Sequence, residues 1–332
     1  MVVALAVAAG GCGGNGQSTL SPDSRASHAI SVLWWAMLAG SAVVFGVVLV
    51  LVLAAAVHRR GDEPRPRWAA LLGEPFVLVS GIALPALVLI GLFVATLVVL
   101  PKTSPAASPA GSAVVSRAGG LAIVVTGRQW FWDVEYPAQH VRSANEIHLP
   151  VGETVTLELR SADVVHSLWV PELNRKMDMI PGQTNSLRLR ARRAGVFRGQ
   201  CAEFCGLQHA HMALYVVAQP PDEFRGWLEH EARTPAPPAT PAAQRGQQVF
   251  LGSACVYCHR IAGTNASGEV GPDLTHVASR LSLGAGTIPN TKGYLGGWIL
   301  DPQHVKPGNR MPGTSLSGDE LQDLLAYLET LR

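Results

Sequence analysis

Soft metal ligands gather in one short stretch, "GQCAEFCGLQHAHM" at residues 199–212. It holds two cysteines, two histidines and a methionine within fourteen positions. Thiolate, imidazole and thioether groups together favour copper over magnesium, calcium or manganese. A single blue-copper ion needs only one thiolate, so Cys201 and Cys205 predict two copper ions that share both sulfurs. Such a centre transfers electrons and does no bond chemistry.

The other ligands of this centre must come from nearby on the same loop and from one distant strand. His209 and Met212 follow the cysteines, and "DVVHSLWVP" supplies His166 upstream. His211 is predicted to be a non-ligand, because consecutive residues of an extended chain point in opposite directions. A Cys201–Cys205 disulfide and a zinc site are the alternatives. Zinc accepts Cys and His ligands but gives no use to a methionine or a distant histidine.

A second chemical motif, "CVYCH", lies at residues 255–259. C-x-x-C-H is the attachment motif for c-type haem. Cys255 and Cys258 would form the thioethers, and His259 would bind the iron. A thioredoxin-like redox motif is the alternative, but it needs a βαβ context, and the surrounding pattern does not predict one. With these assignments no disulfide is expected.

The sixth iron ligand should come from later in the chain. Met311 in "NRMPG" is the only methionine after the motif. His276 and His304 are the alternatives. A His/Met pair raises the reduction potential relative to a His/His pair.

Two long segments have the composition of membrane helices. Residues 26–57 and 75–100 contain no Lys, Arg, Asp or Glu, and about 20 apolar residues span a bilayer core. We therefore predict a transmembrane hairpin over 26–100, with helices at about 29–57 and 75–100. The connection holds four arginines, whereas only Arg25 precedes the first helix. The positive-inside rule places this connection in the cytoplasm and everything after residue 100 outside.

The first residues, 1–25, contain a short apolar stretch that ends in small residues and Cys12. This pattern resembles a lipoprotein signal, with Cys12 as the lipidated residue after cleavage. A signal peptide has basic residues before its apolar stretch, and none is present here. An uncleaved or truncated leader is the alternative.

The rest of the chain divides into two predicted domains joined by linkers. A Pro- and Ser-rich linker at 101–120 precedes short strand-like runs over 121–232, which are typical of an all-β sandwich or barrel. A Pro-rich spacer at 233–241 leads to an all-α domain over 242–332. Ser317 and Glu320 predict a capping box at the start of its last helix.

Net charge gives little information about partners. The whole chain carries +2, and residues 241–332 contain seven basic and seven acidic residues. The last domain therefore has no overall field to steer a partner. We expect no nucleic-acid partner.

The segments "VVHSLWVP" and "GQCAEFCGLQHAHM" together resemble the dinuclear copper-A (CuA) motif of cytochrome c oxidase subunit II. The resemblance implies a cupredoxin-like Greek-key β-barrel behind two transmembrane helices. The fused tail resembles class I cytochromes c in Gly246, Phe250, "GPDL" and Tyr327, as in caa3-type oxidases. The implied copper ligands are the side chains of His166, Cys201, Cys205, His209 and Met212 with the backbone carbonyl of Glu203. The Glu203 carboxylate would face the catalytic subunit, where the family has a magnesium site.

The resemblance also assigns roles to Trp130 and Glu74. Trp130, in the aromatic run "GRQWFWDVEYP", would be the residue through which electrons reach the copper. Because side chains alternate along a strand, at least one of Trp130, Phe131 and Trp132 should be core. Glu74 would lie at the mouth of a proton channel in the catalytic subunit, although its distance from Pro85 is longer than usual. A solvated acid at a helix end is the alternative.

The resemblance implies an overall function in the respiratory chain. The chain would be subunit II of a proton-translocating caa3-type oxidase in the bacterial cell (inner) membrane, passing electrons from haem c to copper-A and on to subunit I. There O2 is reduced to water. Expected partners are the other oxidase subunits and a cytochrome or quinol–cytochrome c reductase as donor. A nitric oxide reductase subunit and a membrane-anchored electron carrier without an enzyme partner are the alternatives.

Overall fold

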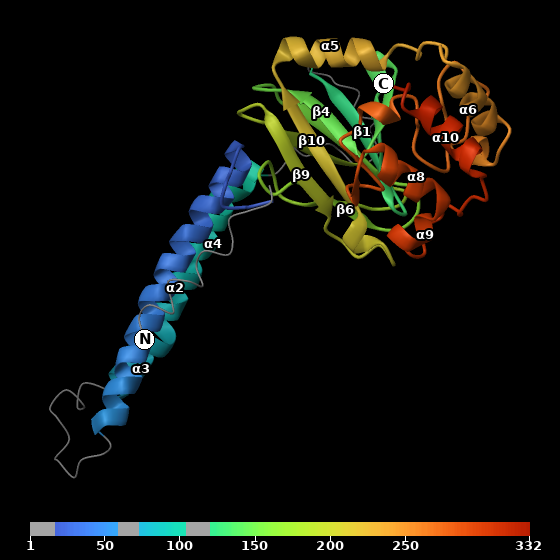
Figure 1. The fold of residues 1–332 in the computed structure, drawn as a ribbon. Coiled ribbons are helices and arrows are strands. Elements are labelled where there is room, and N and C mark those ends of the chain that lie inside the picture. The colour runs from blue at the N-terminus through green and yellow to red at the C-terminus, as the bar shows by residue number, and fades with distance from the viewer. Residues whose placement is uncertain (1–16, 59–72, 104–119) are drawn as a thin grey trace. The chain divides into compact units, whose positions relative to one another are not determined.

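The computed structural model describes residues 17–58, 73–103 and 120–332 (Figure 1). The chain forms two compact units, one over residues 25–104 and one containing the β-rich and C-terminal regions. Cys12 and the arginines between the two apolar segments lie outside the described residues, so the predictions about lipidation and loop orientation stay predictions.

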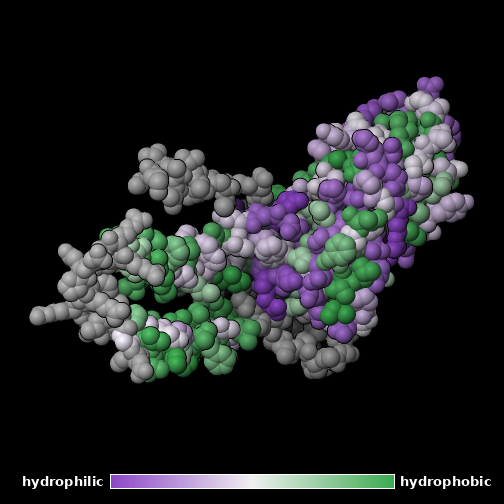
Figure 2. Space-filling model, turned by 90° about the horizontal axis from the view of Figure 1, so that it is seen from below, coloured by the Kyte–Doolittle hydropathy of each residue, from purple (hydrophilic) through white to green (hydrophobic). Residues whose placement is uncertain are grey.

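The helical unit consists of two apolar rods that lie side by side (Figure 1). Helix α2 spans Arg25–His58, and the second rod runs through α3 (Glu74–Leu78), a π-helical segment (Val79–Ala83) and α4 (Leu84–Thr103). The candidate membrane spans have mean hydropathies of 2.7 and 2.8, and none of either window is buried. The face of this unit that Figure 2 shows is mostly hydrophobic, as a lipid-facing helix requires. The unit anchors the chain in a membrane.

The β-rich domain contains two five-stranded sheets. One has the order β3-β2-β1-β5-β8 and the other β4-β10-β9-β6-β7. Their strands are β1 Ala122–Arg128, β2 Phe131–Tyr136, β3 Val141–Ala144, β4 Glu146–Pro150, β5 Val155–Ser161, β6 His166–Trp169, β7 Met177–Met179, β8 Asn185–Leu189, β9 Gly195–Cys201 and β10 Ala213–Gln219.

The two sheets pack through a shared hydrophobic core. Inward side chains such as Val134 from one sheet and Leu168 and Phe197 from the other are fully or almost fully buried. β1 pairs with β5 in parallel, and β10 pairs with β4 in parallel, while the other pairs are antiparallel. The predicted cupredoxin-like β fold is confirmed, although the barrel is open and forms a sandwich of two sheets. Trp132 has no exposed surface, which confirms that one residue of the aromatic run is core.

Helix α5 (Pro221–Glu231) covers one end of the sandwich. Its Trp227 stacks on the ring of His148, with centroids 3.9 Å apart and nearly parallel planes. Phe224 is buried against the same core. These contacts hold α5 against the β-rich domain.

The C-terminal domain has its own core and is mainly helical. Its helices are α6 Pro241–Leu251, α7 Cys255–Cys258, α8 Lys292–Leu300, α9 Pro302–Val305 and α10 Gly318–Leu328. The capping box of Ser317 and Glu320 at α10 is confirmed. The prediction of an all-α domain is wrong at one place, a hairpin of two short strands, β11 (Ser282–Leu283) and β12 (Ile288–Pro289).

Helices α6 and α10 pack against one another in this domain (Figure 1). A Cβ on Gly246 would lie 1.9 Å from the carbonyl oxygen of Asp323, so only glycine permits this approach. Next to it, the rings of Phe250 and Tyr327 meet edge to face at 6.2 Å. These contacts fix the helix that precedes the "CVYCH" motif.

Candidate metal centre and haem site

Two free cysteines face one another at the end of β9. Cys201 closes the strand and Cys205 lies in the following loop, and their sulfurs are 3.8 Å apart. A disulfide needs about 2.05 Å, and both cysteines are free. Two metal–sulfur bonds of about 2.3 Å each can bridge this gap. The pair therefore fits shared metal ions.

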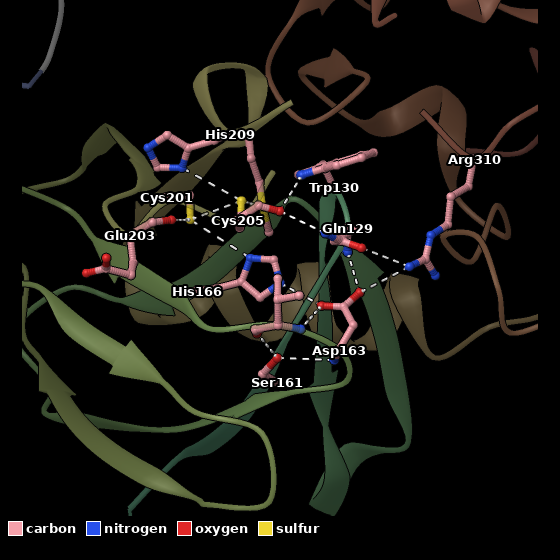
Figure 3. A network of polar contacts seen from close by, with 12 residues as sticks. Gln129, Trp130, Ser161, Asp163, His166, Cys201, Glu203, Cys205, His209 and Arg310 are labelled. Atoms are coloured by element: carbon pink, nitrogen blue, oxygen red, sulfur yellow. Dashed lines mark hydrogen bonds and ion pairs between the residues drawn. The ribbon is translucent and has the colours of Figure 1, made fainter. Parts of the chain in front are cut away.

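One imidazole faces each sulfur of the pair (Figure 3). Nδ1 of His166 lies 3.9 Å from Sγ of Cys201, and Nδ1 of His209 lies 3.7 Å from Sγ of Cys205. Each sulfur also has one weaker ligand group beside it. The carbonyl oxygen of Glu203 is 3.2 Å from Sγ of Cys201, and Sδ of Met212 is 3.9 Å from Sγ of Cys205. The structure thus brings together all six groups that the copper prediction named.

The distant histidine reaches this loop through strand pairing. β6 begins at His166 and pairs antiparallel with β9, with Leu168 opposite Cys201. Gly127 on β1 faces the imidazole, and a Cβ there would come within 2.8 Å of the ring. His166 itself is fully buried. Sheet register and a missing side chain therefore set the position of the ring.

Asp163 is a functional residue that the sequence prediction missed. Its Oδ1 lies 2.8 Å from Nε2 of His166, and its Oδ2 accepts a hydrogen bond of 2.7 Å from the backbone N–H of Gln129. A carboxylate on the far nitrogen of a ligating histidine fixes its tautomer and ring orientation. Here it directs Nδ1 toward Cys201. An acid three residues before the histidine was the available signal.

Burial and hydrogen bonding shift the pKa values of His166 and Asp163 in opposite directions. Burial alone would lower the pKa of His166, but hydrogen bonds with Asp163 and Cys201 raise it overall. Burial likewise opposes ionisation of Asp163, whereas hydrogen bonds from His166 and two backbone N–H groups lower its pKa. The lowered pKa keeps Asp163 ionised, and its carboxylate orients the imidazole of His166.

The sulfur pair already contains one thiolate without metal. The hydrogen bond with Cys205 lowers the pKa of Cys201 to about 3, and the same contact raises the pKa of Cys205. Metal ligation requires deprotonated thiols. Metal binding at neutral pH should thus release at least one proton from the pair.

Asp163→Asn is expected to weaken copper binding by about 10–100-fold, the usual effect of removing such a partner of a ligating histidine. The amide keeps the shape but loses the negative charge that orients His166. Copper affinity would be measured by competition with a chelator of known affinity. Asp222→Asn on α5, where the side chain is 88% exposed, is the control. Equal affinities for the Asp163 variant and the native chain would show that this carboxylate does not support the ligand.

Trp130 lies directly over the metal-binding loop. It occupies the turn between β1 and β2, and its indole N–H donates a 3.0 Å hydrogen bond to the carbonyl of Cys205. Gly206 has a φ of +112°, and a Cβ there would come within 3.0 Å of the indole ring. Gln129 donates to the same carbonyl at 2.8 Å. The position suits the predicted electron-transfer role.

Two other predicted residues have partners away from the sulfurs. The carboxylate of Glu203 lies 3.3 Å from Nζ of Lys176. Nδ1 of His211 lies 2.9 Å from Oε1 of Gln208, consistent with the prediction that it is no ligand. Glu74 is the first residue of α3.

The "CVYCH" motif forms helix α7, with His259 immediately after it. Nδ1 of His259 lies 2.8 Å from the carbonyl of Pro272, which leaves Nε2 as the free ligand atom. A Cβ on Gly271 would come within 2.6 Å of the imidazole, so the backbone packs closely against the ring. Burial lowers the pKa of His259 and keeps it neutral for metal binding. Cys255 and Cys258 are both free, so the motif fits covalent haem attachment.

The structure separates the three candidates for the sixth ligand. Both ring nitrogens of buried His276 face carbonyl oxygens, of Arg332 at 2.8 Å and of Arg233 at 3.2 Å. His304 is exposed on α9. Met311 is partly buried, and its backbone is held by the side chains of Asn309 and Gln303. The ring of His276 is therefore engaged elsewhere, and Met311 stays the predicted ligand.

Comparisons with known proteins match both domains. The family "Cytochrome C oxidase subunit II, periplasmic domain" matches residues 138–219, and the family "Cytochrome c" matches residues 243–332. Cytochrome c oxidase subunit 2 of Alkalihalophilus pseudofirmus is 39% identical over 63% of this chain, which spans 61% of that relative. The same subunit of Bacillus subtilis is 28% identical over 82% of this chain and 79% of its own length.

A solved structure is also similar to part of this chain. The crystal structure of the periplasmic domain of subunit II of cytochrome oxidase from Bradyrhizobium japonicum is 31% identical. The match covers 33% of this chain and 92% of that chain, with a TM-score of 0.33.

The fold and the two clusters define a membrane-anchored electron-transfer protein with a cupredoxin-like domain and a cytochrome c domain. The two family matches and the relatives identify it further. Residues 138–219 belong to the family of cytochrome c oxidase subunit II periplasmic domains and residues 243–332 to the cytochrome c family, and the chain as a whole is similar to cytochrome c oxidase subunit 2.

Proposed function

We propose that this chain is the electron-accepting subunit of a caa3-type cytochrome c oxidase. Electrons enter at haem c in the C-terminal domain, pass to a dinuclear copper-A centre and continue to subunit I. There O2 is reduced to water and protons are pumped. The observation that carries the proposal is the pair of facing sulfurs of Cys201 and Cys205, each beside one imidazole.

The residues that would hold the copper are Cys201, Cys205, His166 and His209, with Met212 and the carbonyl of Glu203 as weaker ligands. When bound, two coppers that share one unpaired electron supply one-electron exchange with little change in geometry. The chain holds these donors in a buried pocket, where both sulfurs are almost inaccessible to solvent. A rigid, dry ligand set reduces the rearrangement that each transfer requires.

The proposed haem is attached to Cys255 and Cys258 and bound by His259 and Met311. Such a His/Met pair gives a higher potential than a His/His pair. The hydrogen bond from Nδ1 of His259 to Pro272 orients the imidazole toward the iron. Trp130, in the turn between β1 and β2, contacts both domains: its carbonyl accepts a hydrogen bond from Lys306 of the haem domain, and its indole N–H donates to Cys205 of the copper loop.

The remaining roles depend on partner subunits. Glu203 would contribute to a magnesium site at the contact with subunit I, in exchange for its ion pair with Lys176. Glu74 would lie at the mouth of a proton channel in subunit I. A cytochrome or quinol–cytochrome c reductase would supply electrons to the haem on the outer side of the cell membrane.

The test is to isolate the chain with its native membrane partners and to follow O2 and NO consumption with a reducing donor. The proposal predicts rapid O2 uptake and haem A in the complex. NO reduction with haem b and little O2 uptake would instead place the chain in a nitric oxide reductase. Isolation without partners would leave an electron carrier.

A further inference from the structure

The haem domain is seated on the copper loop through a defined set of contacts. The tip of the β11–β12 hairpin meets the start of β10, where the N–H of Ala213 donates a 2.9 Å hydrogen bond to the carbonyl of Ala285. A Cβ on Gly286 would lie 2.8 Å from Cβ of Ala213. Ala213 directly follows the proposed ligand Met212. The contact therefore begins one residue from the copper site.

A second segment of the haem domain, residues 306–310, contacts the same loop at Leu207 and Gln208. We call this segment the clamp. The carbonyl of Pro307 accepts a hydrogen bond of 2.5 Å from Gln208, and a Cβ on Gly308 would come within 2.7 Å of Leu207. Arg310 donates to Oε1 of Gln129 at 2.9 Å and lies 4.0 Å from Oδ2 of Asp163 (Figure 3).

Lys306 is the centre of this contact. Its side chain is buried, with 2% of the residue exposed. Nζ donates to three backbone carbonyls, those of Trp130 at 3.1 Å, His211 at 2.9 Å and Gly284 at 2.9 Å. An ammonium group has three N–H donors, so each finds one acceptor. The first two acceptors belong to the copper domain and the third to the haem domain's own hairpin.

Burying the ammonium of Lys306 is unfavourable unless its carbonyl acceptors are in place. Burial lowers the pKa of Lys306 to about 7, so the charge depends on the three carbonyls for its stability. Conversely, the carbonyls of Gly284 and His211 also accept from the hydroxyl of Thr287, at 2.6 and 3.4 Å. Removal of the ammonium would therefore cost mainly the hydrogen bond to Trp130, the one that crosses to the copper domain without a second donor among the described residues. A surface lysine on a solvated domain has no need of this geometry. The site is built for a docked haem domain.

We propose that Lys306 is a positioning residue that locks the haem domain onto the copper loop in the arrangement used for electron transfer. The inference rests on the proposed function, because it assigns the route from haem to copper to this contact. The clamp leads directly into Met311, the proposed iron ligand. Locking Lys306 against the backbone of Trp130 and His211 therefore fixes the distance between the haem ligand loop and the copper loop.

The lock also explains why a tethered domain needs a specific contact. The Pro-rich linker gives the haem domain a high effective concentration near the copper domain, but it does not select one orientation. Lys306 and the hairpin tip supply that selection. Without the lock, transfer would have to wait for the haem domain to find the productive orientation.

The test compares Lys306→Met with the native full-length chain carrying both cofactors. After a pulse of reductant to haem c, electron transfer to copper should be about tenfold slower in the variant. The variant's rate should also depend on solvent viscosity, because domain motion then limits it. Lys292→Met on α8, whose side chain is 48% exposed, is the control and should match the native rate.

The cofactor spectra separate positioning from misfolding. Unchanged copper EPR and haem absorption in a slow Lys306→Met variant would support the lock. An unchanged, viscosity-independent rate would overturn it, and so would a slow rate accompanied by an altered copper signal. If the native chain itself passes no electron from haem to copper, the proposed function fails, whatever the variant does.

Discussion

Cys201→Ser is expected to abolish the mixed-valence copper EPR signal and to leave the c-haem spectrum intact. A serine hydroxyl is a hard, protonated group at neutral pH, whereas two coppers need soft thiolates to bridge them. Cys201 is also the group whose pKa lies at about 3, so the variant loses the thiolate that exists before metal arrives. The two hydrophobic cores are separate, which is why the haem should not respond.

The measurement is EPR and metal analysis of the purified chain, with the haem spectrum recorded on the same sample. Leu157→Met is a matched control, because Leu157 is fully buried in the same core but lies on β5, in the sheet opposite the one that contains β9 and the cysteines. It should keep the copper signal, whereas Met212→Leu should distort it. A normal copper signal in Cys201→Ser would contradict the proposed ligand set. Loss of haem in the same variant would contradict the claim that the copper and haem sites form independently.

Met311→Leu is expected to convert the low-spin haem into a high-spin or histidine-ligated form. Leucine is apolar and similar in size, so the partly buried loop should keep its packing while the iron loses a thioether ligand. Absorption and EPR spectra of the oxidised and reduced chain would show the change. The reduction potential should fall, because thioether ligation favours reduced iron.

His304→Ala is the control for this experiment, because His304 is the exposed alternative on the neighbouring helix. Its spectrum should match the native one. A native spectrum in Met311→Leu together with a changed spectrum in His304→Ala would assign the ligand to His304 instead.

Local signals made the copper loop and the haem motif predictable. Cys201, Cys205, His209 and Met212 lie within twelve positions, so a single turn of chain can bring them together. "CVYCH" is similarly self-contained, and the capping box at Ser317 depends only on residues three apart. For such features the geometry follows from spacing, and the structure agrees.

The features that the sequence did not predict depend on distant backbone. Lys306 binds three carbonyl oxygens, and every residue type carries a carbonyl, so no pattern identifies its acceptors. The open two-sheet sandwich depends on β1 pairing with β5 and β10 with β4, pairings that hydrophobic alternation does not specify. Gly127 acts by lacking a side chain beside His166. Asp163 could have been proposed, since ligating histidines usually have such a partner.

The most direct test of the central claim is a single turnover of the isolated membrane complex. The complex would be fully reduced, mixed rapidly with O2, and followed at the copper and haem c absorption bands. The proposed electron route predicts that copper is oxidised first and haem c afterwards, as electrons move from this chain into subunit I. O2 consumption while haem c and copper both stay reduced would contradict the claim that this chain delivers the electrons.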